Sequence, residues 1–412
     1  MTVLQNREEA GHVDTRCTRE AELLIASSRS SVDLPTQQHI RTLANSGPDW
    51  DRLVNLSKLH GTAPLLYRAL STICPDVVPQ ELLRSLQHYY VAVVVRNARM
   101  ATALVEIVGM LEKRGIPVRP LKGPALAVLA YDDITLRVFG DLDLLIRKRD
   151  LAAAIDALIA QKFVYSMSDR PDGLGQPERK YHTLQRRGDD FFVDLQWMIA
   201  AQDFSFSLEH ESFWERTALL EVAGVKIASL SPEAILLVLC IHGSKHLWSH
   251  LKWTCDVAEL LHRHPHLDWK WILRLSSKLG CRRMLLLGLL MSRDVLGATV
   301  ADEILDQTGR DTAVEVLAIR LLGRLRAGED PSDETTFNGT EYLVLRNRLR
   351  DRMQFLVHLC IAISPADRAR LKSFPASFRA FYYALLPLRV VGRRMPVPRL
   401  KSAVSQWLER MG

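Results

Sequence analysis

The chain has 412 residues, of which 48% are hydrophobic and 25% are charged, as in an ordinary soluble globular protein. Its formal charge of +7 permits a nucleotide or another phosphorylated partner without requiring nucleic acid. The six cysteines are scattered without a C-x-x-C pair, and no apolar run reaches the length of a membrane span. The N-terminus also lacks an apolar signal segment, so we expect a cytoplasmic protein with reduced thiols and no transmembrane segment.

The first part of the chain is predicted to be helical. Residues 1–16 are polar and are expected to form a flexible N-terminus. Residues 17–114 show apolar positions at helical spacing, for example at positions 50, 53, 56 and 59. We expect this N-terminal helical region to pack against the functional site and frame the substrate.

A short strand, a turn and a helix are predicted next. Ile116 to Leu121 forms the strand, and a glycine turn leads into a helix that ends at Tyr131. A helix that starts after a glycine turn favours an anion, because its first N–H groups are free. Lys122 and Gly123 are therefore candidate phosphate-binding residues. A solvated surface lysine is the alternative for Lys122.

Asp141 and Asp143 lie on a predicted strand that follows a turn at Gly140. Successive side chains of a strand point to opposite faces, so the two carboxylates share one face, and Leu142 and Leu144 share the other. Two unpaired carboxylates inside a protein are costly, and Mg²⁺ (or Mn²⁺) is the usual solution. The alternative is that one aspartate caps a turn and the other pairs with Arg137 or Arg147.

A third carboxylate, Asp194, lies on another predicted apolar strand, from Phe191 to Trp197. On a neighbouring strand it would complete a cage of three carboxylates for two metal ions, which clamp the attacking and leaving oxygens of a phosphoryl displacement. His182, on the preceding strand, is expected either to act as a base beside the carboxylates or to hydrogen-bond within the sheet.

A helix that begins at Ser231 carries a polar stripe. The stripe follows the spacing i, i+3, i+4 and i+7 at His242, Lys245, His246 and Ser249, and Asp256 prolongs it if the helix continues. It faces either a phosphorylated ligand or solvent. A zinc site built on the two histidines is the weaker alternative, because no glutamate follows the first of them.

The remaining sequence divides into three predicted parts. Residues 201–326 are expected to form a helical domain, 327–340 a loop and 341–412 a C-terminal helical region. The basic segment of the last region is expected either to dock on the protein or to touch a membrane surface or a partner. Residues 168–180 are rich in glycine and proline and are expected to form a loop over the site.

Four motifs occur in a fixed order along the chain. They are Leu121-Lys122-Gly123, Arg137-x-x-Gly140-Asp-x-Asp143, Val193-Asp-Leu-x-Trp197 and His242-x-x-Lys245-His246. Together they resemble the DNA polymerase β-like nucleotidyltransferase superfamily, and more narrowly a bacterial nucleotidyltransferase family often encoded beside peptide natural-product and polysaccharide clusters. The resemblance covers most of residues 45–390. The narrower family tends to carry histidine where Gln196 stands.

The resemblance implies an α+β fold, with a small mixed β-sheet nucleotidyltransferase core over residues 115–200 flanked by N-terminal and C-terminal helical regions. It implies transfer of an NMP from an NTP, with ATP favoured, to an acceptor hydroxyl with release of pyrophosphate. A peptide or another small molecule is favoured over nucleic acid as the acceptor. The implied metal ligands and catalytic residues are Asp141, Asp143 and Asp194. The implied nucleotide-binding residues are Lys122, Gly123, Arg137, Gly140, His242 and Lys245.

Two other functions stay open at this point. A protein that keeps the fold could bind nucleotides without catalysis, and the three carboxylates argue against it. A toxin-like relative could modify an RNA end, but the chain has no arginine-rich patch interleaved with aromatic residues.

Overall fold

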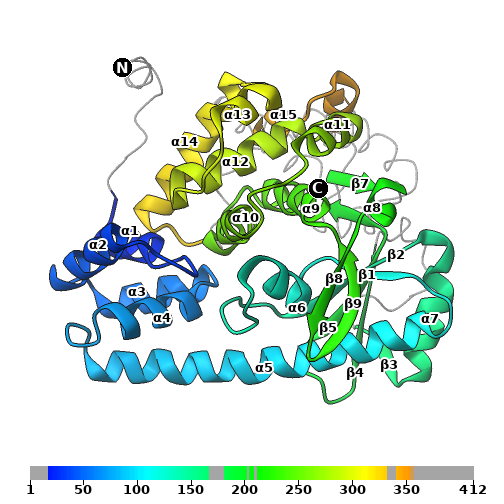
Figure 1. The fold of residues 1–412 in the computed structure, drawn as a ribbon, viewed down its shortest axis with the longest axis horizontal. Coiled ribbons are helices and arrows are strands. Elements are labelled where there is room, and N and C mark those ends of the chain that lie inside the picture. Colours follow the sequence, from blue (N-terminus) through cyan, green and yellow to red (C-terminus); the bar gives the residue numbers. More distant parts are fainter. Residues whose placement is uncertain are drawn as a thin grey trace, which may run out of the picture.

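The computed structural model describes residues 17–166, 181–201, 204–207, 211–331, 340–353 and 355. Its first five helices are α1 (Arg19–Ala26), α2 (Leu34–Asn45), α3 (Trp50–Leu59), α4 (Ala63–Ile73) and α5 (Gln80–Glu112). Helix α5 has 33 residues and is therefore about 50 Å long. It runs from the N-terminal helices to the sheet and joins the two parts of the molecule (Figure 1). The prediction of a helical N-terminal region is confirmed.

A five-stranded mixed sheet follows α5. Its strands are β1 (Val118–Pro120), β2 (Asp141–Ile146), β3 (Phe163–Tyr165), β4 (Tyr181–Arg186) and β5 (Phe192–Gln196), in the order β1-β2-β5-β4-β3. Strands β2 and β5 are parallel, whereas the other neighbouring pairs are antiparallel. The 3-10 helix η3 (Lys148–Asp150) and helix α7 (Leu151–Ala160) connect β2 to β3. The predicted small mixed sheet with flanking helices is confirmed.

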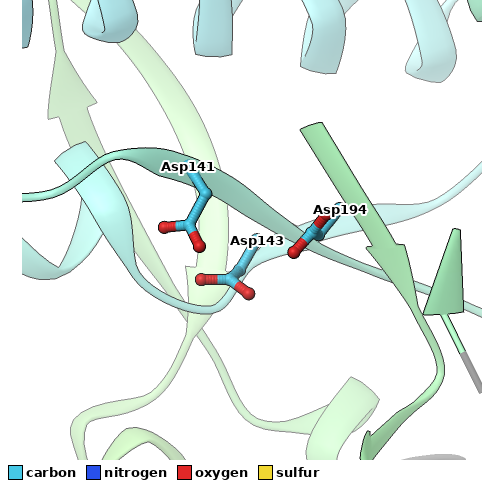
Figure 2. A group of neighbouring side chains, drawn as sticks. All are labelled: Asp141, Asp143 and Asp194. Atoms are coloured by element: carbon cyan, nitrogen blue, oxygen red, sulfur yellow. The ribbon is translucent and has the colours of Figure 1, made fainter. Parts of the chain in front are cut away.

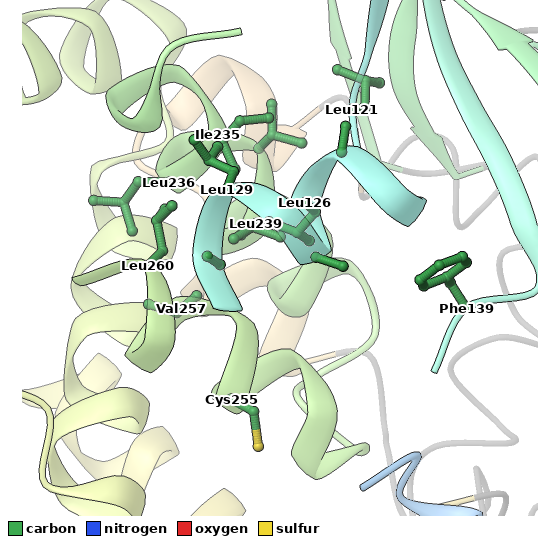
Figure 3. Packing of buried hydrophobic residues seen from close by; sticks show 14 of the residues in the cluster. Leu121, Leu126, Leu129, Phe139, Ile235, Leu236, Leu239, Cys255, Val257 and Leu260 are labelled. Carbon is green, nitrogen blue, oxygen red and sulfur yellow. The ribbon is translucent and has the colours of Figure 1, made fainter. Parts of the chain in front are cut away.

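Two short helices replace the single helix predicted between β1 and β2. Helix α6 (Gly123–Leu126) passes directly into the π-helix η2 (Ala127–Tyr131). The π-helix η2 packs against α10 (Leu251–Arg263), which in turn packs against α9 (Pro232–Lys245), and Figure 3 shows apolar side chains of these elements. This contact fixes the later helices against the part of the chain that leads into β2.

Two hairpins and a short helix open the region that was predicted to be helical from residue 201. The first hairpin is β6 (Met198–Ala201) with β7 (Phe204–Ser207), helix α8 spans Glu211–Glu215, and the second hairpin is β8 (Thr217–Val222) with β9 (Val225–Leu230). Buried and exposed residues alternate along β8, and Ala223 and Gly224 both have positive φ in the turn. The sequence pattern that predicts this hairpin is the alternation of apolar residues along the strand, followed by a two-residue turn.

The later part of the chain is helical. Its helices are α11 (Trp269–Leu279), α12 (Arg282–Leu296), α13 (Asp302–Thr308), α14 (Thr312–Ala327) and α15 (Thr340–Val344). None of the helices in the described ranges is long and apolar enough to cross a membrane. The predicted loop 168–180 and the basic C-terminal segment lie outside the described residues.

The cysteines of the described chain are all free, and four of the five are buried. Cys240 and Cys255 are among the buried ones, whereas Cys17 is exposed.

The segment between η2 and β2 is held by a buried polar network. The guanidinium of Arg137 donates to both carboxylate oxygens of Asp256, through Nε at 2.7 Å and Nη2 at 2.9 Å. The hydroxyl of Tyr131 donates to the same carboxylate at 2.9 Å. From α5, the amide of Asn97 donates to the backbone oxygens of Ile134 and Arg137. Helices α5 and α10 therefore both hold the segment that leads into Asp141, the first residue of β2.

We predict that Asp256→Ala lowers the free energy of unfolding by about 3–5 kcal/mol, because it leaves the buried Arg137 cation without its partner. Chemical denaturation measures this loss. Arg263→Met is the matched control on the same helix, since it removes only an exposed ion pair with Asp132 and should cost less than about 1 kcal/mol. Equal losses in the two variants would contradict the role given to the buried pair.

Candidate functional site

Asp141, Asp143 and Asp194 converge on one face of the sheet (Figure 2). One carboxylate oxygen from each lies within 4.8 Å of those of the other two. Among the described residues, these three form the one cluster of three or more His, Cys, Asp or Glu side chains that could hold a metal ion. The prediction that the third aspartate lies beside the first two on a neighbouring strand is confirmed.

The parallel register of β2 and β5 brings the carboxylates together. Asp143 lies directly opposite Asp194, and Asp141 lies opposite Phe192. Because side chains alternate along each strand, all four point to the same face. The opposite face carries leucine and valine side chains that are almost completely buried. This buried face fixes the register, since a slip of one residue would bury the aspartates instead.

Burial and mutual repulsion both act on the carboxylates. Burial raises the pKa of Asp194 to about 6; a hydrogen bond from Thr183 opposes this shift, and the charges of Asp143 and Asp141 add to it. The pKa of Asp141 is raised first by burial and then by the charge of Asp143. The three ionised groups therefore destabilise one another unless positive charge lies between or beside them.

The donor set fits a divalent cation. Asp194 Oδ1 is buried and accepts no hydrogen bond from the described residues. A buried carboxylate oxygen without a donor is costly, and a cation removes that cost. Three carboxylates suit Mg²⁺ or Mn²⁺, which prefer hard oxygen ligands.

Both oxygens of Asp143 are engaged by side chains from neighbouring segments. The ammonium of Lys122 lies 2.9 Å from Oδ2, and the side-chain amide of Gln196 donates to Oδ1 at 2.7 Å. Lys122 reaches this position because the backbone N–H of Leu121 is bonded to the carbonyl of Asp143 at the end of β1. Lys122 is therefore not a solvated surface lysine. Gln196 thus supplies a hydrogen-bond donor to the cluster.

The two predicted glycines have backbone roles beside the site. Gly123 has a φ of +63°, and a Cβ there would lie 3.3 Å from the carbonyl oxygen of Asp141, so the turn after β1 favours glycine. Gly140 precedes β2, and its carbonyl accepts a hydrogen bond from Arg96 of α5. Arg96 also donates to the carbonyl of Asp190, so it joins the segments that lead into β2 and β5.

Helix α9 faces the carboxylates across a cavity of about 320 Å³. His242, Lys245 and His246 line this cavity together with the three aspartates and Lys122. Burial lowers the pKa of His246 to about 3 and that of His242 well below its ordinary value, so both imidazoles are uncharged near neutral pH. Their rings contact each other and Trp253. Lys122 and Lys245 are thus the two cationic side chains among the described residues that line the cavity.

The structure corrects the predicted stripe on this helix. Helix α9 ends at Lys245, and Leu247 and Trp248 both have positive φ before α10 starts at Leu251. Asp256 therefore does not extend the stripe, and lies instead in α10 with Arg137. Arg137 pairs through two nitrogens with Asp256, so it is not the partner of Asp141 or Asp143 that the alternative expected.

His182 lies on the wrong face of the sheet to act beside the carboxylates. It is opposite Leu195 in the register of β4 and β5, whereas Thr183 is opposite Asp194. Its ring lies near those of Tyr165 and Trp197. Of the two alternatives for His182, the base is the one that the geometry contradicts, because strand pairing places the side chain one residue out of phase with the site.

Two residues that the sequence did not single out belong to this surface. Thr183 and Phe192 line the cavity on the side of β4 and β5. Phe192 is 40% exposed, which is high for an aromatic residue on a central strand. The sequence contained a sign of this, because Phe192 lies two residues before Asp194 and therefore points to the same face of the strand.

A small mixed sheet that gathers three carboxylates beside two lysines defines a class of protein whose site can hold a divalent cation next to an anionic ligand. A comparison with family models agrees with this class. The model described as an uncharacterised nucleotidyltransferase matches residues 46–297, more than half of the chain, and the protein belongs to that family. Searches of curated proteins and of solved structures returned no match.

We predict that Asp194→Asn stabilises the metal-free protein at high pH. A carboxyl with a raised pKa in the folded state binds more protons than in the unfolded state, so stability falls as pH rises from about 4 to about 6. In a chelator, the variant should exceed the wild type by up to about 3 kcal/mol near pH 8, with less gain near pH 5. Denaturation at both pH values measures this, with the exposed Asp156→Asn as control. A gain that did not change with pH would count against the assignment.

We predict that Gln196→Ala weakens Mn²⁺ binding about tenfold, because a donor that orients a ligand carboxylate contributes to metal affinity. Isothermal titration calorimetry measures the change. Gln196→His is the matched variant, since an imidazole N–H can take over the bond to Asp143 and should retain most of the affinity. Wild-type affinity in the alanine variant would show that the amide does not orient the ligand.

Proposed function

We propose that this protein transfers an NMP group from an NTP, with ATP favoured, to the hydroxyl of a small molecule or peptide and releases pyrophosphate. The observation that carries the proposal is the convergence of Asp141, Asp143 and Asp194 beside two lysines in one cavity. Membership of a nucleotidyltransferase family supports the same reaction class.

The two walls of the cavity contribute different groups to nucleotide binding. Lys122 from the β1–α6 turn and Lys245 from α9 offer point charges to the triphosphate. Mg²⁺ or Mn²⁺ held by the three aspartates would supply charge neutralisation at the α-phosphate and at the leaving pyrophosphate. His242 and His246 are uncharged, and they complete the wall without adding positive charge.

Asp194 is the residue placed to take the proton of the acceptor. It lies opposite Asp143 on the side of the cavity that Thr183 and Phe192 line, which is the side left to an acceptor when the lysines hold the triphosphate. The acceptor oxygen forms a bond to the α-phosphorus, the bond from that phosphorus to the bridging oxygen breaks, and the acceptor proton passes to Asp194. Pyrophosphate leaves toward the lysines.

The chemistry of the cavity beside Asp194 favours an uncharged acceptor. Phe192 and Thr183 give the side next to Asp194 an uncharged lining. A polyanionic nucleic-acid end would find less complementary charge on this side than an uncharged peptide or small molecule does.

We predict that Asp141→Asn and Asp143→Asn each reduce turnover below about 1% of the wild-type rate, because each removes a carboxylate from the cation site. Pyrophosphate release should be followed with each of the four NTPs, with Mg²⁺ or Mn²⁺, and with cell extract as the source of acceptor.

Asp156→Asn is the control, since this exposed aspartate lies on α7 outside the site. Release that requires both the extract and the intact aspartates supports the transferase. Equal release by wild type and the two site variants would contradict it. Metal-dependent NTP binding without release in any extract would favour a binding protein.

A further inference from the structure

Lys122 occupies the place of a cation in the carboxylate cluster. Its ammonium lies 2.9 Å from Asp143 Oδ2, and the two side chains are only 16% and 6% exposed. Within the described part of the chain, Lys122 is the one side chain that forms an ion pair with any of the three aspartates. Its charge also lowers the pKa values of Asp141 and Asp194, against the stronger effect of burial. The lysine is therefore the direct counter-ion of the cluster, while Arg137 and Lys252 also lower the pKa of Asp141.

A metal ion and this ammonium compete for the same oxygen. A bound Mg²⁺ or Mn²⁺ lies about 2.1 Å from a carboxylate oxygen, so a metal on Oδ2 would be at most about 5 Å from the ammonium in its present position. Two cations at that distance in a partly buried site repel each other strongly. The other oxygen of Asp143 is already held by Gln196, which leaves the lysine as the group that must move.

The lysine has a second anion within reach when a nucleotide is present. Lys122 and Lys245 line one cavity, and the side chain of lysine carries its charge on a flexible stem. A triphosphate in that cavity offers negative charge to a lysine that has left Asp143. The lysine would then stay paired in both states, with different partners.

We propose that Lys122 exchanges its partner during substrate binding, pairing with Asp143 in the metal-free protein and with the triphosphate when the metal is bound. This inference rests on the proposed function for its second half only. Metal alone binds weakly, because it must displace the ammonium without giving it a new partner. Metal and nucleotide bind cooperatively, because the phosphates accept the displaced lysine. The coupling is reciprocal, so each ligand raises the affinity for the other by the same factor.

The test compares Lys122→Met with wild type by isothermal titration calorimetry. Methionine has nearly the length of lysine and no charge. We expect the affinity for Mn²⁺ alone to rise about tenfold or more in the variant, because the internal competitor is gone. With a non-hydrolysable ATP analogue, we expect nucleotide affinity to fall and the mutual enhancement between Mn²⁺ and nucleotide to decrease about tenfold or more.

Two variants control for general effects of charge. Lys122→Arg keeps the positive charge at the cluster and should bind Mn²⁺ alone about as weakly as wild type. Lys245→Met removes a charge from the same cavity, and no carboxylate of the described residues lies within ion-pair distance of this lysine. It should raise Mn²⁺ affinity much less than Lys122→Met does. Melting curves without metal show whether each variant is folded.

The two arms separate failure of this proposal from failure of the proposed function. Unchanged or weaker Mn²⁺ binding by folded Lys122→Met would overturn the exchange, whatever happens with nucleotide. Tighter Mn²⁺ binding together with undiminished coupling to the ATP analogue would overturn its second half. Binding of Mn²⁺ but of no nucleotide by the wild type would contradict the proposed nucleotidyl transfer and, with it, the exchange of partners. The Mn²⁺ titration of Lys122→Met would still decide whether Lys122 competes with the metal.

Discussion

The repulsion among three carboxylates is the constraint around which this molecule is arranged. It arises from the backbone, because the parallel pairing of β2 with β5 places Asp143 opposite Asp194 on one face. The opposite face is apolar and buried, so the strands cannot slip to relieve the repulsion. Hydrophobic burial thus holds like charges together, and the sheet stores an electrostatic cost that a cation can remove.

The groups that offset this cost come from distant parts of the chain. Lys122 comes from the turn after β1, and Lys245 comes from α9 on the far side of the cavity. Helix α9 packs on α10, and α10 is held by its packing on η2 and by the buried pair of Arg137 with Asp256. The cavity is therefore complete only when the later helices have docked on the sheet, and its electrostatics depends on tertiary structure more than on any single motif.

The sequence allowed the sheet, its mixed character and the three aspartates to be predicted, because alternation along an apolar strand decides which side chains share a face. It did not reveal the face of His182, since the phase of β4 depends on its pairing with β5. It did not reveal the break after Lys245, where neither glycine nor proline marks the positive φ of Leu247 and Trp248. The partner of Arg137 was equally hidden, because Asp256 lies 119 residues further along the chain.

The π-helix η2 has a consequence for how this segment can change in length. A π-turn holds one more residue than the α-helical turn that it replaces, so it can be gained or lost through a single-residue insertion or deletion. Loss of one residue between Ala127 and Tyr131 would restore α-helical winding and leave the following side chains pointing in nearly the same direction. Tyr131 would still face Asp256, and the tether of the strand that carries Asp141 would keep its bond. The π-turn is therefore the place in this segment where the chain length can change by one residue without loss of the tether.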